Sequence, residues 1–113
     1  MPESLMAFTV KFTSSAKKDL RELHTYIAKN DSRENADYVA QEIFRAALAL
    51  SELPTRGAHP PELLARGNRA YRQIFFKPYR ILYRIRANTV FVGVIADGRR
   101  DMVSLPSRRI PAP

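Results

Sequence analysis

Arginine dominates the second half of this 113-residue chain, and its side chain binds phosphates and carboxylates through paired hydrogen bonds. From residue 66 onward there are eleven Lys or Arg against two Asp or Glu, whereas residues 1–65 have eight against nine. Three of these arginines, Arg80, Arg84 and Arg86, lie in one segment among Tyr and Ile residues. The one-sided charge therefore predicts a surface for an anionic macromolecule rather than for a small neutral ligand.

The segment 79–86 alternates in the way typical of a β-strand with one buried face. Its odd-numbered residues are Tyr or Ile and would face the core, while its even-numbered residues are three arginines and a leucine and would form a cationic face. One interpretation is a docking surface for nucleic acid or for an acidic protein segment. The other is a solvated outer face on which arginine stems cover apolar area.

A second cationic motif, Asp97-Gly98-Arg99-Arg100-Asp101, directly follows an apolar run. A glycine at a strand end permits a tight turn, so the two arginines would project from the sheet edge. They could contact a partner, or one of them could pair with a flanking aspartate as a structural clamp.

Catalytic groups are scarce. Ribonuclease chemistry needs a base, an acid and a cation for the phosphate, yet the basic half has no histidine and a single lysine, Lys77. His59 is interpreted as a loop residue that caps backbone groups, and His24 as a residue at the rim of a helix. The chain has no cysteine, no metal-ligand spacing and no glycine-rich phosphate loop. The sequence therefore favours a binding protein over an enzyme and predicts no cofactor, no metal and no catalytic residue.

Composition limits the class of protein. With 45% apolar residues the chain is typical of a folded globular protein, and its length predicts one domain over residues 1–113 with flexible ends at 1–6 and 110–113. It has neither a long apolar run nor a signal-peptide pattern, which predicts a cytoplasmic protein without a transmembrane span. Met6 is an alternative to Met1 as the true start.

The elements that position the arginines begin with a strand over residues 8–12 and two helices. Thr13-Ser14-Ser15 offers N-cap oxygens for the first helix, whose apolar stripe comprises Ala16, Leu20, Leu23 and Ile27. Asp31 and Glu34 have capping-box spacing for the second helix, which continues toward Pro54. So short a connection predicts an antiparallel helical hairpin.

Three strands are expected after a loop at 54–68, over residues 71–76, 79–86 and 90–96. Connections of hairpin length predict an antiparallel meander, and the continuously apolar last segment suits a central strand buried on both faces. Gly93 would mark a bulge or a close approach of another backbone. The order predicts an α+β fold: an N-terminal strand, an antiparallel helical hairpin and a three-stranded antiparallel meander, in one sheet with the hairpin on one face.

Nine short pieces of the sequence carry a family resemblance. In order they are Phe12-Thr13-Ser14-Ser15-Ala16, Asp19-Leu20, Tyr26-Ile27-Ala28, His59-Pro60-Pro61-Glu62-Leu63, Gly67, Tyr71-Arg72-Gln73-Ile74, Pro78-Tyr79-Arg80-Ile81-Leu82-Tyr83-Arg84, Asp97-Gly98-Arg99-Arg100-Asp101 and Leu105. Their order and spacing resemble the ParE toxins of the ParE/RelE superfamily over about residues 8–109, nearly the whole chain.

This resemblance implies the toxin of a bacterial type II toxin–antitoxin pair with a RelE/ParE-like fold, of the branch that poisons DNA gyrase. It also implies a ParD-like antitoxin and a higher-order toxin–antitoxin assembly. The lack of a long apolar run predicts no membrane partner, and a module that binds nucleic acid directly is a third, less favoured hypothesis. We expect an acidic, amphipathic antitoxin tail that enters the groove beside the helical hairpin. The expected basic contacts to antitoxin or target are Arg72, Arg80, Arg84, Arg99 and Arg100, with Phe75 and Phe76 as additional candidates.

The alternative is a RelE-type ribosome-dependent mRNA endoribonuclease. Members of that branch resemble this chain at Arg80 and Arg100, which would hold the scissile phosphate. However, Arg72 and Ile74 stand where RelE proteins tend to have lysines, and no Tyr or His follows Asp101. These departures favour gyrase inhibition over RNA cleavage.

Overall fold

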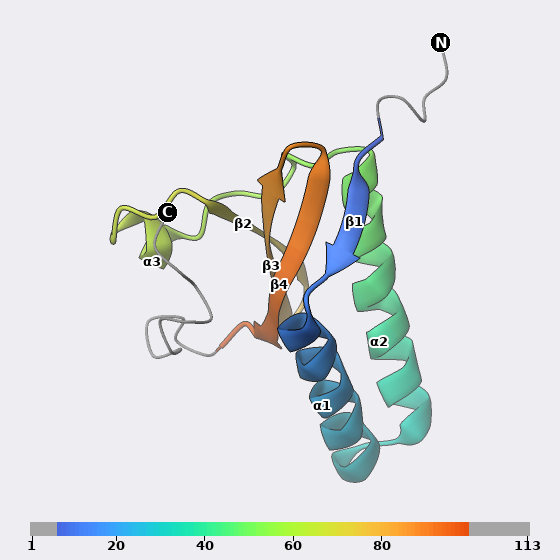
Figure 1. Cartoon of the computed structure of the whole chain (residues 1–113). Helices are drawn as coiled ribbons and strands as arrows, with labels where there is room; N and C mark the ends of the chain where they lie inside the picture. Colours follow the sequence, from blue (N-terminus) through green and yellow to red (C-terminus); the bar gives the residue numbers. More distant parts are fainter. Residues whose placement is uncertain (1–6, 100–113) are drawn as a thin grey trace.

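Four strands form one sheet, and two long helices pack as an antiparallel hairpin against one of its faces (Figure 1). The computed structural model describes residues 7–99. Its elements are β1 (Thr9–Phe12), α1 (Ser14–Asn30), α2 (Arg33–Leu48), the 3₁₀ turn η2 (Ala49–Ser51), the short α3 (Pro61–Leu64), β2 (Tyr71–Phe76), β3 (Tyr79–Arg86) and β4 (Thr89–Asp97). The predictions for Arg100 and for flexible ends at 1–6 and 110–113 lie outside the described residues.

The strand order is β1-β4-β3-β2, and the expected α+β fold is confirmed. β2, β3 and β4 form the predicted antiparallel meander, while β1 pairs with β4 in parallel. The apolar strand β4 therefore takes the central position. Leu82 pairs with Val94 and Tyr83 pairs with Val92, so Gly93 is the extra residue of a β-bulge, as its position in the sequence indicated.

Side-chain caps define the helical hairpin. Thr13 Oγ1 accepts from the backbone N–H of Ala16 at 3.1 Å, so the predicted cap of α1 is confirmed. The predicted capping box that starts at Asp31 is wrong: the cap of α2 is Ser32, whose Oγ accepts from the N–H of Asn35 at 3.0 Å. Asp31 instead ends α1, because its own N–H donates to Ile27 O, and only Ser32 has the extended backbone of an N-cap.

The sheet has an apolar cluster on each face. The first core lies under the hairpin and includes Ile27, Ile43, Ile81 and Tyr83. The second core lies on the opposite face, where α3 and its flanking loops cover part of the sheet, and consists of Leu63, Tyr71, Leu82, Val94 and Ala96. The expected cationic face is therefore only partly open to solvent, because this apolar cluster covers part of it and Arg80 is buried there. No helix within residues 7–99 combines the length and hydropathy needed to cross a membrane.

Candidate interaction surface

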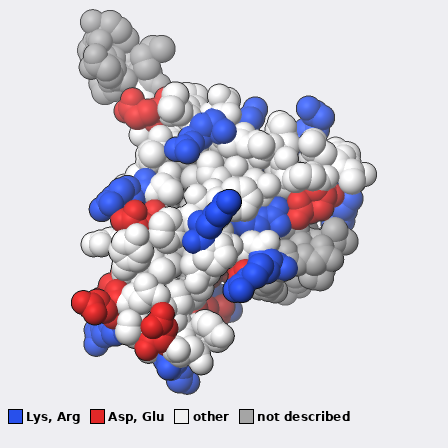
Figure 2. Space-filling view, turned by 180° about the vertical axis from the view of Figure 1, so that it is seen from behind, with Lys and Arg blue, Asp and Glu red and all other residues white. Residues whose placement is uncertain are grey.

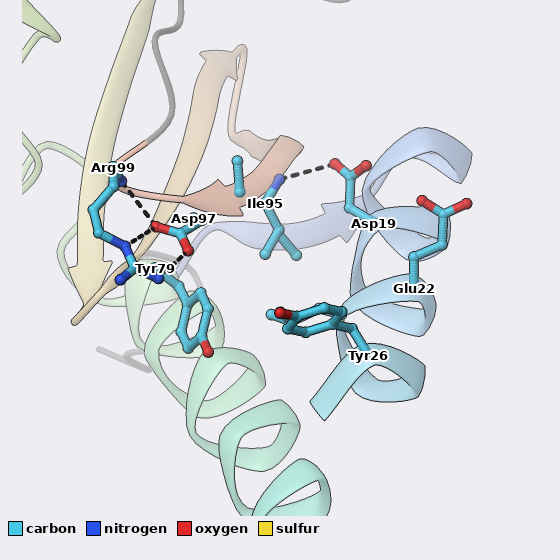
Figure 3. Close-up of a pocket in the computed structure, with 9 residues that line it drawn as sticks. Asp19, Glu22, Tyr26, Tyr79, Ile95, Asp97 and Arg99 are labelled. Atoms are coloured by element: carbon cyan, nitrogen blue, oxygen red, sulfur yellow. Dashed lines mark hydrogen bonds and ion pairs between the residues drawn. The ribbon is translucent and has the colours of Figure 1, made fainter. Parts of the chain in front are cut away.

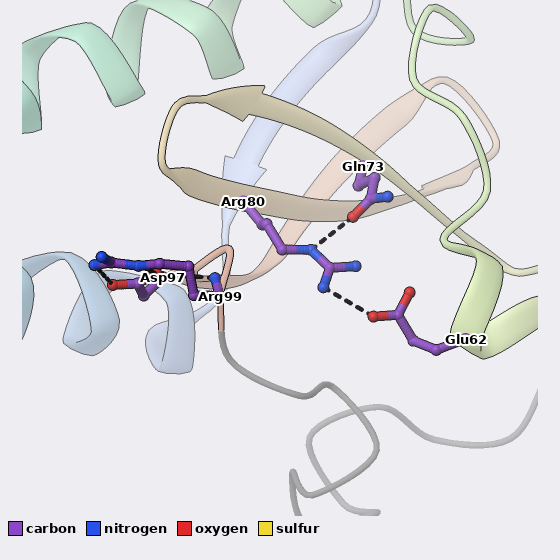
Figure 4. A network of polar contacts seen from close by, with 5 residues as sticks. All are labelled: Glu62, Gln73, Arg80, Asp97 and Arg99. Atoms are coloured by element: carbon purple, nitrogen blue, oxygen red, sulfur yellow. Dashed lines mark hydrogen bonds and ion pairs between the residues drawn. The ribbon is translucent and has the colours of Figure 1, made fainter.

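Arg80 lies inside the protein rather than on its surface. It is 6% exposed, and its guanidinium joins α3 to the sheet (Figure 4). Nε donates to Gln73 Oε1 at 2.8 Å, and Nη1 donates to Glu62 Oε2 at the same distance. The hydrogen bond from Arg80 lowers the pKa of Glu62, so the carboxylate stays ionised beside the cation. Through these bonds Arg80 stabilises the packing of α3 on the sheet.

Arg72 braces the loop between η2 and α3. Its Nη1 donates to the carbonyl oxygens of Gly57 at 2.8 Å and Thr55 at 3.2 Å. Arg72 pairs with Tyr83 in the sheet register, so it shares the helix-facing side, away from Arg80 and Arg84. The predicted arginines therefore do not form one surface.

The Tyr83 hydroxyl completes the same brace from within the first core. It donates to Pro54 O at 2.7 Å and accepts from the N–H of Gly57 at 3.0 Å. Burial raises the pKa of Tyr83 above its ordinary value of 10.0. The hydroxyl thus satisfies two backbone groups of an irregular loop that have no partner in a strand.

We expect Tyr83→Phe to lower the free energy of unfolding by about 1–3 kcal/mol, because the buried N–H of Gly57 loses its acceptor. The folded state holds this proton more tightly than the unfolded chain, so its contribution is present below about pH 10 and is lost as pH rises through the raised pKa. Raising the pH from about 9 to about 11 should therefore lower the free energy of unfolding of the parent more than that of the variant, as measured by urea unfolding at each pH. Equal losses in the two proteins would contradict this assignment.

Arg84 belongs to a row of side chains that crosses all four strands on the face opposite the hairpin. The register aligns Lys11 with Phe91, Phe91 with Arg84, and Arg84 with Tyr71; we call these four residues the open row. The Arg84 guanidinium lies over the Tyr71 ring, 5.6 Å from its centroid, in cation–π geometry. Lys11 and the neighbouring Arg86 are exposed, so the open row presents cations to solvent.

On the face seen in Figure 2 the cations are dispersed. Lys and Arg side chains are separated by uncharged surface, and acidic groups lie among them, several at the lower end where the hairpin lies. Phe75 is 50% exposed, whereas Phe76 is half-buried and meets the Tyr38 ring edge-on. Of the two aromatic candidates, only Phe75 is well placed for a partner.

Arg99 is held by the strand that precedes it. Its Nε and backbone N–H donate to Asp97 Oδ1 at 2.8 and 2.9 Å, and Nη2 donates to Oδ2. The N–H of Gly98 donates to Pro78 O at 2.6 Å, and an added Cβ would lie 2.5 Å from that oxygen, so the turn requires glycine. The structure thus shows the clamp for Arg99, which still leaves its side chain exposed; Arg100 is outside the described residues.

A hollow of about 450 Å³ lies between α1 and the ends of β3 and β4 (Figure 3). Asp19 faces it from α1, and its Oδ2 accepts from the backbone N–H of Ile95 at 3.0 Å. Tyr26, from α1, and Tyr79, from β3, lie across the hollow from each other. The Arg99–Asp97 ion pair forms its far rim.

Both histidines have structural partners. His59 Nδ1 is 2.9 Å from Tyr71 O, which ties the loop to the edge of β2, and His24 Nε2 is 2.7 Å from Asp37 Oδ1, which links α1 to α2. The interpretation of His59 as a capping loop residue is confirmed. In the part of the chain that the structure describes, no three His, Asp or Glu side chains gather as metal ligands.

Four functional groups escaped the sequence reasoning: the side chains of Glu62, Gln73 and Asp19, and the Tyr83 hydroxyl. Asp19 lies three residues after Ala16 on the buried stripe of α1, a position that signals an inward carboxylate. Gln73 lies only seven residues from Arg80, diagonally across the predicted hairpin, so the register of that hairpin was its signal. Glu62 and the Tyr83 hydroxyl are 18 or more residues from the groups they bind, and no local spacing could have identified them.

The sequence matches one family model, described as the ParE toxin of the type II toxin–antitoxin system parDE, over residues 10–102. A comparison with curated protein sequences found no significant match. The match spans every described strand and helix except Thr9, the first residue of β1.

Solved structures resemble the fold. A chain of the chromosomal ParDE toxin–antitoxin system from P. aeruginosa superposes with a TM-score of 0.68 at 18% identity, covering 80% of this chain and 96% of that one. The toxin–antitoxin complex RelBE2 from Mycobacterium tuberculosis gives 0.60 at 25% identity, covering 80% and 91%. A mutant of the E. coli toxin RelE in the free state gives 0.59 at 20% identity, covering 93% and 99%.

Proposed function

Because this chain belongs to the ParE toxin family of type II toxin–antitoxin systems, we propose that it inhibits DNA gyrase and that a ParD-like antitoxin neutralises it. On this proposal it is not an enzyme: it traps its target by binding. The competing function within the superfamily is ribosome-dependent cleavage of mRNA, which would require a scissile phosphate held by Arg80.

The burial of Arg80 is the observation that carries this proposal. A group that stabilises a phosphate must present free donors to it, and two of the Arg80 nitrogens already donate to Glu62 and Gln73. Opening this pair would leave the buried Arg80 guanidinium without its carboxylate partner, at a cost of about 3 kcal/mol. Arg80 is therefore better suited to holding α3 than to holding RNA.

The open row and Arg86 are the contacts we propose for the acidic surface of the target. They combine exposed cations with the half-buried ring of Phe91, and aromatic and arginine side chains are enriched where protein interfaces bury their centres. Of the originally expected contacts, Arg84 fits this role directly. Arg72 and Arg80 brace the fold from which the row projects, while the exposed Arg99 is held at its turn by Asp97.

Gyrase supercoiling with purified toxin tests the proposal. We expect relaxed plasmid to stay relaxed at a stoichiometric excess of toxin over gyrase, and added antitoxin to restore supercoiling. Unimpaired supercoiling at that excess, together with codon-specific cuts in translated messages by primer extension, would overturn the proposal in favour of the ribonuclease.

The double variant Arg84→Gln/Arg86→Gln should weaken gyrase inhibition about two- to thirtyfold, because each solvent-accessible cation contributes about 0.2–1 kcal/mol. The matched control is Arg45→Gln, which removes an exposed cation from α2 that pairs only with Glu42 among the described groups. The readout is the toxin concentration that halves supercoiling. Equal loss in both variants would show a general charge effect instead of a contact.

A further inference from the structure

The hollow beside α1 has the lining of a pocket for a long side chain. Leu23, Ile95 and Ala96 line it with apolar surface, and Tyr26 and Tyr79 present aromatic rings from opposite sides (Figure 3). Tyr26 is 65% exposed and so can meet an incoming group without displacing a neighbour. An aliphatic stem would lie against the apolar lining with its head between the rings.

The charges around the hollow select the head group. Asp19, Glu22 and Asp97 supply three carboxylates, whereas Arg99 is the one cation among the lining residues that the structure describes, and it is bonded to Asp97. Glu22 also has an ion pair with Lys18 at 3.9 Å, in which both side chains are largely exposed. Asp19 is fixed in place by its bond to the Ile95 N–H, so its carboxylate places a negative charge at a defined point of the lining. In a chain with a formal charge of +8, this hollow is locally acidic.

We propose that the hollow binds an arginine or lysine side chain from the antitoxin tail, an identification of the partner that rests on the proposed function. Tyrosine faces attract a cation that lies within about 6 Å of the ring centroid, and the lining carboxylates accept its hydrogen bonds. The apolar lining buries the methylene stem, as aromatic and aliphatic surfaces do for arginine and lysine elsewhere.

This inference refines the expected chemistry of the antitoxin. A uniformly acidic tail would match the open row but would be repelled at the hollow, where like charges meet. The tail therefore needs acidic residues that reach Arg84 and Arg86 and one basic residue that reaches Tyr26 and Tyr79. Such alternation also fixes the register of the tail on the toxin.

The test uses the ¹⁵N-labelled full chain and three acetylated, amidated pentapeptides, Ala-Leu-X-Leu-Ala, in which X is arginine, citrulline or glutamate. Citrulline has nearly the shape of arginine without its charge. We expect the arginine peptide to shift the amide resonances of Ile95 and Ala96, with a dissociation constant of about 1 mM. The citrulline peptide should bind about fivefold more weakly, and the glutamate peptide should leave these resonances unmoved.

Two variants and a control locate the contact. Glu22→Gln and Tyr26→Leu change exposed residues of the hollow, so both should fold, and each should weaken the arginine peptide about threefold. Glu34→Gln removes a carboxylate from α2 outside the hollow and should change nothing. Equal binding of the arginine and citrulline peptides, stronger shifts by glutamate, or no shift at about 10 mM peptide would each overturn the inference.

These outcomes are independent of the gyrase assay. Failure of the arginine peptide with intact gyrase inhibition would remove this inference and leave the proposed function standing. Selective binding of the arginine peptide by a chain that does not inhibit gyrase would remove gyrase inhibition as the function and leave the binding of a basic side chain in the hollow standing.

Discussion

Replacing Arg80 with methionine is expected to lower the free energy of unfolding by about 2–3 kcal/mol. The substitution keeps most of the buried volume, but it leaves the partly exposed Glu62 carboxylate without its cation and removes the donor to Gln73 Oε1. Urea denaturation of the parent and of Arg80→Met measures the difference. Arg84→Met is the matched control: within residues 7–99 the interaction found for the partly exposed Arg84 side chain is its cation–π contact with Tyr71, so the change should cost less than about 1 kcal/mol.

The pH dependence separates the ion pair from simple packing. Arg80 lowers the pKa of Glu62 below its ordinary value of 4.5. The unfolded chain therefore takes up this proton first, and the stabilisation present above about pH 4.5 is lost as pH falls through the lowered pKa. The difference between parent and Arg80→Met should thus shrink on acidification. If the difference in free energy of unfolding stayed constant down to about pH 3, the lower stability of Arg80→Met would come from altered packing and not from the lost ion pair.

Replacing Gly57 with alanine should lower the free energy of unfolding by about 2–3 kcal/mol. An added Cβ would lie 2.6 Å from Gln73 O and 2.7 Å from the Tyr83 hydroxyl. Neither can easily retreat: one is strand backbone, and the other is bonded to Pro54 O and to the N–H of Gly57 itself. The loop must shift, and Arg72 then loses its hold on Gly57 O.

The control for this substitution is Gly93→Ala. At that position the nearest atom to an added Cβ is a Tyr71 ring carbon at 3.7 Å, an ordinary contact, so the change should stay below about 1 kcal/mol. Thermal unfolding of both variants, followed by circular dichroism, measures the contrast. Equal destabilisation would mean that backbone freedom, and not the crowding at Gly57, limits both sites.

The fold was predictable because its signals are local. The apolar stripe of α1, the alternation of 79–86 and the continuous apolar run of β4 each repeat with the period of the element that they form. The predicted N-cap of α2 was wrong by one residue. Asp31 and Ser32 are both residue types that cap helices, and only the backbone geometry shows that Ser32 is the cap. The parallel pairing of β1 with β4 has no local signature, since it joins segments some eighty residues apart.

The candidate site was predictable only in its charge. Composition indicates a cationic second half, but it cannot separate Arg84, which reaches solvent, from Arg80, which is buried against Glu62. Both occupy the same face of the same strand. Arg80 is buried because α3 covers its end of that face, whereas Arg84 reaches solvent because α3 leaves the other end open.

The sequence by itself determined the elements, their order, the family and the excess of arginine, because each depends on which residue types are present and how they are spaced over short stretches of chain. Tertiary structure alone decided which arginines brace the protein and which reach solvent, and it formed an acidic hollow from residues of α1, β3 and β4. The physical reason is that a charge acquires its role from the groups within a few ångströms of it. For Arg80, Arg72 and Asp19, those groups lie between 7 and 76 residues away along the chain.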